Sequence, residues 1–314
     1  MTTARFFLFL SCFTLIWSGC GGSDDNGTAP APTEVKVSGA IAKSGTWSGT
    51  VTLTADADIN TGVHITIAKG TVFEGADGAV LHVHGNLSVN GSVASPISMQ
   101  PVSGATSWGG IVVESGGVAQ IHNVTGSKVA TLLTCKTGAL ACVIDRAAFS
   151  GLGQALDASS EVAIEKSVFE NMSTDGMVVN VGGNVTITDS VFRGAPADLL
   201  IVSGGALTIS YCEIGADLTN EHDDVHISSS TQVDISYSNI IGAVYGISIG
   251  NTPNASVQYN NFLTNDTDVA SLGSNGVIDM SYNYWDSGTP VGLGSAFTFN
   301  NTSAVPILGT GPRP

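Results

Sequence analysis

A unit of about 22 residues recurs along most of the chain, and this repeat limits the possible folds more than any other feature. The unit reads VAIEKSVF at residues 162–169 and VTITDSVF at residues 185–192. Its third position is hydrophobic and returns after 20 to 26 residues each time. These reference positions are Met99, Ile121, Ile144, Ile164, Ile187, Ile209, Ile235, Val257 and Met280. Hydrophobic and polar residues alternate within the unit, as in a half-buried strand, and no helical half-repeat accompanies them. The repeat therefore predicts an all-β solenoid, a parallel β-helix.

Equivalent positions of successive units carry similar side chains, as the stacking of coils in a β-helix requires. Each coil would hold three short strands, and each strand would pair with its equivalent one coil away at ~4.8 Å. One column is large and apolar: Phe149, Phe169, Phe192, Ile214, Ile240, Phe262 and Trp285. A second column is small and then polar, which suits a tight bend: Ala147, Ser167, Ser190, Cys212, Ser238, Asn260 and Asn283. We expect roughly 10 to 12 coils over residues 35–305 and a C-terminal tail at 306–314.

These repeats, together with the closing Asn283-Tyr-Trp285, resemble the right-handed parallel β-helix proteins of the pectin-lyase-like superfamily. The chain is most similar to their uncharacterised bacterial surface members. The resemblance implies a right-handed solenoid. It does not select a function, because lyases, hydrolases, epimerases, adhesins and scaffolds share this fold.

The N-terminal residues have the pattern of an export signal. Arg5 precedes an apolar run that ends at Trp17, too short to span a bilayer comfortably. Ser18-Gly19-Cys20 follows and resembles the bacterial lipoprotein signal, which implies removal of residues 1–19 and acylation of Cys20. The alternative is an ordinary secretory signal cleaved near Gly19. Residues 20–34 are rich in Gly, Pro and polar residues, which is typical of a flexible tether.

The resemblance to lipoproteins also implies a location. Gly21, where inner-membrane lipoproteins of Gram-negative bacteria carry Asp, implies the outer membrane, with its periplasmic and surface faces both open. The chain has 26 acidic and 10 basic residues and a net charge of −16. This charge argues against nucleic acid and anionic headgroups as partners. No apolar run near 18 residues follows the leader, so we expect the lipid to be the sole membrane attachment. We expect a monomer, with a polysaccharide as a possible partner.

No set of catalytic residues can be assembled from the sequence. Asp223-Asp224 loosely resembles the first acidic element of the polygalacturonases, but the next coil has Gly242-Ala-Val-Tyr-Gly246 where a second acidic pair would stand. Neither Gly-His-Gly nor Arg-Ile-Lys occurs. Hydrolysis by paired carboxylates needs both acids. We therefore expect a non-enzymatic envelope protein, a scaffold or a carbohydrate-binding protein. A polysaccharide lyase or glycoside hydrolase is the alternative.

The densest group of potential metal ligands lies in the longest coil, at residues 221–226. Asp223 and Asp224 offer carboxylate oxygens, which suit calcium, and His222 with His226 would favour zinc. The alternative is a solvated acidic loop. Beyond this possible calcium site we expect no cofactor.

Four tyrosines occupy the same position of four successive coils: Tyr211, Tyr237, Tyr259 and Tyr282. Lys166 and Asp189 hold that position in earlier coils, which indicates exposure to solvent. Phenol rings spaced one coil apart would form a ledge on which a glycan could stack. The alternative is an aromatic stack that covers the bend.

The cysteines fit an exported protein. Cys135 and Cys142 enclose a short segment, and we expect a disulfide between them, worth roughly 2–3 kcal/mol. Cys212 stands in the small column and is expected to be a buried free thiol.

Overall fold

A computed structural model describes residues 34–215, 222–252, 255–273, 278–290, 292–293 and 297–314. The signal segment, Cys20 and all of the tether except Glu34 lie outside these residues. The described part belongs to one compact unit, Thr33–Pro314. It contains strands, turns and bends and no helix, so none of its segments is a helix that could cross a bilayer.

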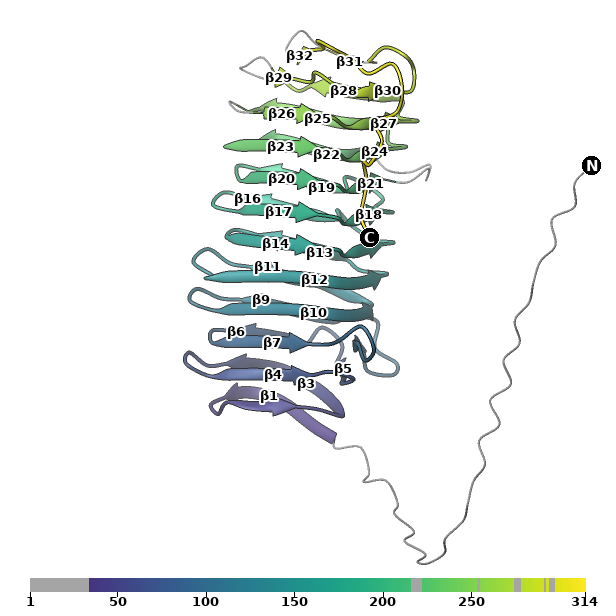
Figure 1. Ribbon diagram of the computed structural model, residues 1–314. Helices are drawn as coiled ribbons and strands as arrows, with labels where there is room; N and C mark the ends of the chain where they lie inside the picture. Colours follow the sequence, from purple (N-terminus) through teal and green to yellow (C-terminus); the bar gives the residue numbers. More distant parts are fainter. Residues whose placement is uncertain (1–33, 216–221, 253–254, 274–277, 291, 294–296) are drawn as a thin grey trace, which may run out of the picture. The chain divides into compact units, whose positions relative to one another are not determined.

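The strands form a solenoid whose coils turn through three faces, each a ladder of parallel pairs (Figure 1). The first face contains β2 (Gly45–Trp47), β4 (His64–Ala68), β7 (Asn86–Asn90), β10 (Val118–Ser127), β12 (Ala141–Ser150), β14 (Glu161–Glu165), β17 (Asn184–Thr188), β20 (Ala206–Ser210), β23 (Gln232–Ser236), β26 (Ala255–Gln258), β29 (Ile278–Asp279) and β32 (Phe297–Thr298).

The second face follows after a sharp corner. It contains β1 (Glu34–Ile41), β3 (Thr50–Ile59), β5 (Val72–Gly75), β8 (Ile97–Pro101), the later parts of β10 and β12, β15 (Val168–Glu170), β18 (Val191–Arg193), β21 (Glu213–Gly215), β24 (Asn239–Ile241), β27 (Asn261–Leu263) and β30 (Tyr284–Trp285).

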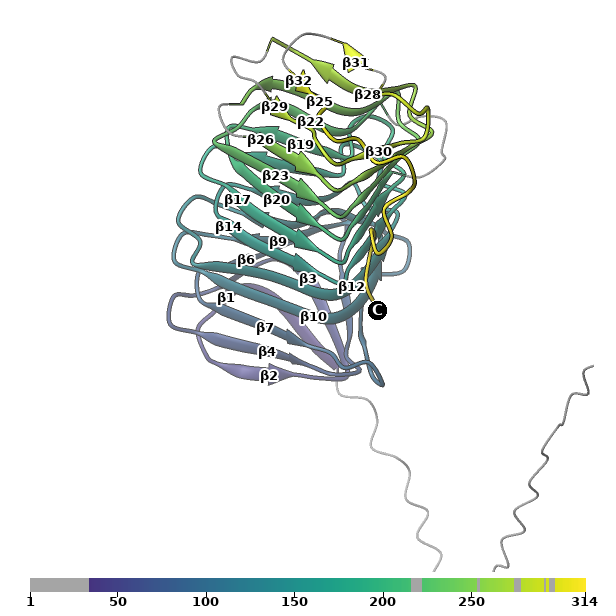
Figure 2. The same cartoon turned by 45° about the horizontal axis from the view of Figure 1, so that its top comes forward.

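The third face completes the coil, and the separate faces are visible in Figure 2. It contains the later parts of β1 and β3, β6 (Val80–Val83), β9 (Trp108–Val113), β11 (Val129–Cys135), β13 (Gln154–Ala158), β16 (Met177–Asn180), β19 (Leu200–Ser203), β22 (Asp223–Ser229), β25 (Tyr245–Asn251), β28 (Thr267–Ser271) and β31 (Gly292–Leu293).

The core follows from the alternation within each strand. In β14 the side chains of Val162 and Ile164 are buried and their neighbours are exposed, and the same pattern recurs in β17. Like residues then stack on like: Phe169 pairs with Phe192 in register, and their ring centroids are 4.9 Å apart. The predicted all-β, right-handed parallel β-helix with a period of about 22 residues is therefore confirmed.

The corner between the first and second faces is held by buried polar side chains. Ser190 Oγ accepts a hydrogen bond from the backbone N–H of Ser167, one coil earlier, at 3.1 Å. Asn260 Oδ1 accepts from Ser238 N at 2.9 Å, and Asn283 Oδ1 accepts from Asn260 N at 2.8 Å. The small and polar column of the sequence is thus a ladder that satisfies backbone donors inside the solenoid.

The last residues run back along the second face, so the C-terminal end lies beside coils far earlier in the sequence (Figure 1). Ile307 N donates to Asn261 Oδ1 at 2.9 Å, and Gly311 N donates to Tyr237 O at 2.9 Å. We call residues 307–313 the C-terminal strap.

Candidate functional site

A cluster of acids and histidines lies where the chain enters the third face. Asp198 precedes β19, and His222 directly precedes β22, whose first residue is Asp223. Ligand atoms of these three residues lie within 4.8 Å of one another. Leu200 pairs with Val225, and this register places Asp198 next to Asp223 in adjacent coils. The parallel ladder therefore brings together residues that are 25 positions apart.

The two histidines both contact the same pair of carboxylates. His226 Nδ1 lies 2.6 Å from Asp223 Oδ2 and 3.5 Å from Asp198 Oδ2. His222 Nδ1 lies 3.0 Å from Asp223 Oδ1 and 3.3 Å from Asp198 Oδ1. The side chain of Asp223 is buried, whereas that of His222 is 59 % exposed. The site is thus open to solvent at His222 and buried at Asp223. We call these four residues the His–Asp cluster.

Asp224 does not join this cluster, although the sequence grouped it with Asp223 as a calcium site. Both acids are fully buried, but successive side chains of a strand point to opposite faces. The Asp224 carboxylate lies against Gly215, where a Cβ atom would be only 2.4 Å from Asp224 Oδ1. The two neighbouring acids therefore have different surroundings, and the suggested calcium role of the pair stays a prediction.

Asp198 was not among the metal ligands expected from the sequence. Its signal was available in the repeat, because Asp198 occupies the register position of Asp223 one coil earlier. It went unnoticed because the intervening coil is the longest one, so the spacing departs from 22 residues.

The donor set of the His–Asp cluster fits a transition metal better than calcium. It offers imidazole nitrogen and carboxylate oxygen, the ligands of Cu(II) and Zn(II) sites. Calcium prefers six to eight oxygen ligands. Among the described residues, no cysteine joins Asp198, His222 and Asp223, so the thiolate ligand that favours Cu(I) is not part of this group.

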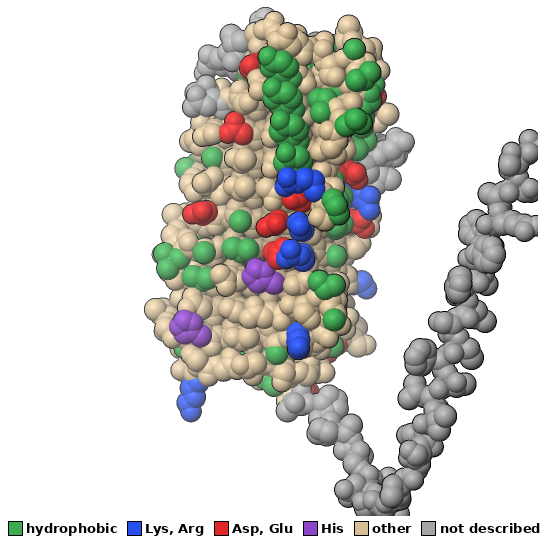
Figure 3. All heavy atoms as spheres, in the orientation of Figure 1, with side chains coloured by type: hydrophobic (Ala, Val, Ile, Leu, Met, Phe, Trp, Pro, Cys, Tyr) green, Lys and Arg blue, Asp and Glu red, His purple; other side chains and the backbone are tan. Residues whose placement is uncertain are grey.

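The four predicted ligand-binding tyrosines form a continuous column at the first corner. Their ring centroids are separated by 5.1, 5.3 and 5.1 Å, with interplanar angles of 7–8°. All four have positive φ angles of 50–65°, so the same left-handed turn aims each ring in the same direction. Figure 3 shows a continuous column of hydrophobic side chains on this face, with Lys and Arg side chains at its lower end.

The geometry of this column decides which part of each ring meets solvent. Because the rings stack face to face, each inner ring turns its faces to its neighbours and its edge outward. Tyr259 and Tyr282 are 37 % and 40 % exposed. The four rings thus have the form of the alternative named above, an aromatic stack that covers the bend. Glycan binding by these residues stays a prediction.

The lower end of the tyrosine column is closed by the C-terminal strap. The guanidinium carbon of Arg313 lies 3.6 Å from the centroid of the Tyr211 ring, a cation–π contact. Arg313 Nε donates to Asp189 Oδ1 at 2.7 Å, and its Nη2 donates to Asp189 Oδ2 at 2.8 Å. These hydrogen bonds hold the pKa of the Asp189 carboxyl below its usual value.

The cysteines lie in two separate environments. Cys135 ends β11 and is joined by a disulfide to Cys142 near the start of β12. Cys212 is a buried free thiol in the ladder of the first corner. Burial raises the pKa of the Cys212 thiol to about 12, so this sulfur is not a thiolate ligand at neutral pH.

The chain matches one known protein family, described as "Periplasmic copper-binding protein (NosD)", over residues 97–295. This segment is more than half of the chain, and it contains the His–Asp cluster and the four tyrosines. No curated protein and no solved structure matches the chain. The family is one of right-handed parallel β-helices, which confirms the resemblance to the pectin-lyase-like superfamily. The chain therefore belongs to the NosD family of periplasmic copper-binding proteins.

Proposed function

We propose that this protein is a rigid β-helix scaffold of the cell envelope that binds Cu(II) through Asp198, His222, Asp223 and His226. The observation that carries the proposal is the convergence of both imidazoles on the same two carboxylates, with His226 Nδ1 only 2.6 Å from Asp223 Oδ2. These four side chains would hold the ion, and the buried Asp223 would fix their positions. A bound Cu(II) would supply a Lewis-acidic centre that the protein carries or passes on.

The family's description supports copper over the other metals that this donor set accepts. The same description fits poorly with our expectation, from the sequence, that the protein has no cofactor. Among the divalent first-row ions, Cu(II) binds N/O sites most tightly. The oxidation state follows from the ligands, because Cu(I) prefers sulfur and the described free thiol, Cys212, is buried and protonated.

An envelope location agrees with the periplasmic family. We keep acylation of Cys20 and attachment to the outer membrane as part of the proposal. They rest on the Ser18-Gly19-Cys20 sequence and on Gly21.

Copper binding is tested by titrating the exported protein with Cu(II) and recording calorimetry and electron paramagnetic resonance. We expect nitrogen hyperfine structure and a stoichiometric site. His226→Gln and His222→Gln should each weaken binding by about tenfold or more, because each removes one ligand.

The matched control is His84→Gln. His84 Nε2 also lies near a carboxylate, 3.5 Å from Asp58 Oδ1, but the described structure shows no third donor beside this pair. Its substitution should leave the affinity unchanged. Equal weakening in all three variants, or full affinity in the two cluster variants, would contradict the assignment.

The carbohydrate-binding role is a second candidate, favoured by the exposure of Tyr259 and Tyr282. At Tyr259 a glycan would have to meet the ring edge and the phenol hydroxyl, because neighbouring rings cover both faces, and at Tyr282 one face is covered in the same way. Edge contacts forgo most of the stacking energy that makes aromatic residues effective in sugar binding. Copper binding on a scaffold is therefore our conclusion.

A further inference from the structure

A tyrosine outside the His–Asp cluster packs directly against one of its imidazoles. Tyr245 is the first residue of β25 and pairs in register with Asp223, one coil earlier. The ring centroids of Tyr245 and His222 are 5.3 Å apart, and the interplanar angle is 66°, which is an edge-to-face contact. Tyr245 N also donates to His222 O at 2.8 Å. The backbone and the side chain of Tyr245 therefore both contact His222.

The two imidazoles of the cluster differ in how firmly their surroundings hold them. His226 lies inside β22, its side chain is 25 % exposed, and its Nδ1 is 2.6 Å from Asp223 Oδ2. The His222 side chain is 59 % exposed, and its Nδ1 lies at 3.0 and 3.3 Å from the nearest carboxylate oxygens. An exposed side chain samples several rotamers unless packing selects one. His222 is therefore the ligand whose orientation depends on a neighbour outside the cluster.

The backbone of His222 is already fixed by the strand ladder. His222 N donates to Ala197 O at 2.9 Å in the preceding coil, and His222 O accepts from Tyr245 N in the following coil. Rotation about the side-chain bonds is the freedom that remains. The ring of Tyr245 stands against the imidazole and limits this rotation.

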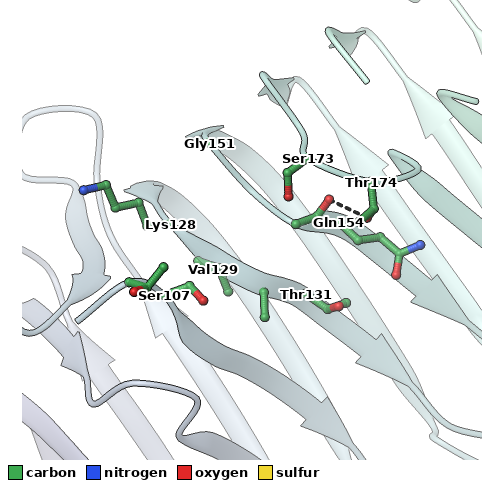
Figure 4. A pocket seen from close by; sticks show the side chains of 11 residues that line it. Ser107, Lys128, Val129, Thr131, Gly151, Gln154, Ser173 and Thr174 are labelled. Atoms are coloured by element: carbon green, nitrogen blue, oxygen red, sulfur yellow. Dashed lines mark hydrogen bonds between the residues drawn. The ribbon is translucent and has the colours of Figure 1, made fainter. Parts of the chain in front are cut away.

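The column of the third face that contains Asp223 shows which side of the cluster Tyr245 closes. Two earlier positions of this column, Thr131 and Gln154, pair in register and line an open hollow of about 450 Å³ (Figure 4). None of the residues that line this hollow carries an imidazole or a carboxylate. The column turns acidic in the following coils and reaches Asp223, and Tyr245 comes next. Tyr245 thus bounds the cluster on the side of the later coils.

We propose that Tyr245 is a positioning residue that holds the His222 imidazole in the orientation that binds Cu(II). This inference rests on the proposed copper site, and it assigns to Tyr245 no contact with the ion itself. The ring acts through His222 alone, because it excludes rotamers that turn the imidazole away from Asp198 and Asp223. Since the contact is made by the ring, a phenylalanine should serve equally well.

The inference is tested by titrating the exported protein that carries Tyr245→Leu with Cu(II). We expect binding to weaken by about fivefold, the effect of one lost aromatic pair, and by less than in His222→Gln. The nitrogen hyperfine structure in electron paramagnetic resonance should change from that of two imidazoles toward that of one. Tyr245→Phe should restore both the affinity and the spectrum.

A double-mutant cycle separates positioning of His222 from a general effect on the fold. In the His222→Gln background, Tyr245→Leu should cause no further loss of affinity, because the side chain through which the ring acts is already gone. Additive losses of affinity would overturn the proposal. The matched control is Tyr284→Leu, at another half-buried tyrosine, which lies in β30 on the second face. This variant should keep the wild-type affinity and spectrum.

The contact between the two rings is measured without copper. In nuclear magnetic resonance spectra of the metal-free protein, the imidazole signals of His222 should shift in Tyr245→Leu and stay in place in Tyr245→Phe. A wild-type protein that binds no Cu(II) would refute the copper site and this inference with it. Wild-type binding that Tyr245→Leu leaves unchanged, or an equal loss of affinity in Tyr245→Phe, would refute this inference alone.

Discussion

Single buried side chains at the first corner satisfy backbone groups that the sharp turn would otherwise leave without partners. Asn260 is fully buried and uses its whole amide: Oδ1 accepts from Ser238 N, and Nδ2 donates to Ile235 O at 2.9 Å and to Gln258 O at 3.0 Å. A buried backbone donor without an acceptor costs about 1–3 kcal/mol. One side chain thus satisfies backbone groups of two successive coils.

We expect Asn260→Ala to lower the free energy of unfolding by about 2–4 kcal/mol, because it removes an acceptor and two donated hydrogen bonds inside the solenoid. Urea unfolding monitored by circular dichroism measures the change. Asn90→Ala is the control, since Asn90 is an exposed residue at the end of β7. A similar loss of unfolding free energy in both variants would contradict this explanation, because Asn90 lies outside the buried ladder.

Much of this residue-level structure was predictable, and the exceptions have physical reasons. The Phe169 and Phe192 column and the Ser and Asn ladder follow directly from the repeat, because equivalent positions must stack. The orientation of the tyrosine rings does not, because sequence spacing sets the distance between rings but not which side faces solvent. The partnership of Asp198 with His226 required the register of a coil whose length breaks the period.

The C-terminal strap is the element that ties several coils of the second face together. Asn261 of β27 exchanges two hydrogen bonds with Ile307, and Asn239 of β24 accepts one from Thr310 Oγ1 at 2.8 Å. Arg313 then reaches Asp189, 124 positions earlier in the chain. From the sequence, residues 306–314 were expected to be only a tail, because no repeat pattern marks a segment that binds through scattered polar contacts.

The strap should make stability depend on pH through Asp189. The folded-state pKa of Asp189 is lowered, so its contribution is present above the unfolded pKa of about 3.9 and is lost as the pH falls through the folded value. Arg313→Ala should therefore reduce the urea midpoint at pH 7 and have a smaller effect at about pH 3.

The control for the strap is Arg146→Ala, which breaks a pair in an earlier coil whose carboxylate, Asp145, is more exposed than Asp189. It should change the midpoint little at either pH. A loss in Arg313→Ala that is the same at both pH values would show that the cation–π contact with Tyr211, rather than the pairing with Asp189, holds the strap.

The described part of Thr33–Pro314 is a linear stack in which each coil contacts its neighbours. The fold could be predicted because the same strand pairing recurs along the chain, so each repeat supplied independent support for it. Stability in such a stack is approximately a sum of terms within coils and between adjacent coils.

We expect Phe192→Ala to destabilise the protein by about 3–5 kcal/mol and to do so locally. The Phe192 side chain is fully buried and stacks on Phe169. Hydrogen exchange should show lost protection in the strands that flank β18, with β6 and β7 unchanged. Val181→Ala, at a side chain that is 75 % exposed, serves as the control. Uniform loss of protection along the chain would indicate one cooperative unit instead.

The register of the third face places Gly110, Thr131, Gln154, Asp175, Asp198 and Asp223 in one column. Each coil advances this column by ~4.8 Å, so the separation between the His–Asp cluster and an earlier position such as Thr131 can change only in whole steps of one coil. Duplication or deletion of one repeat would lengthen or shorten this separation by one step without altering the cluster. Evolution could therefore adjust the spacing of two positions on this face by repeat gain and loss alone.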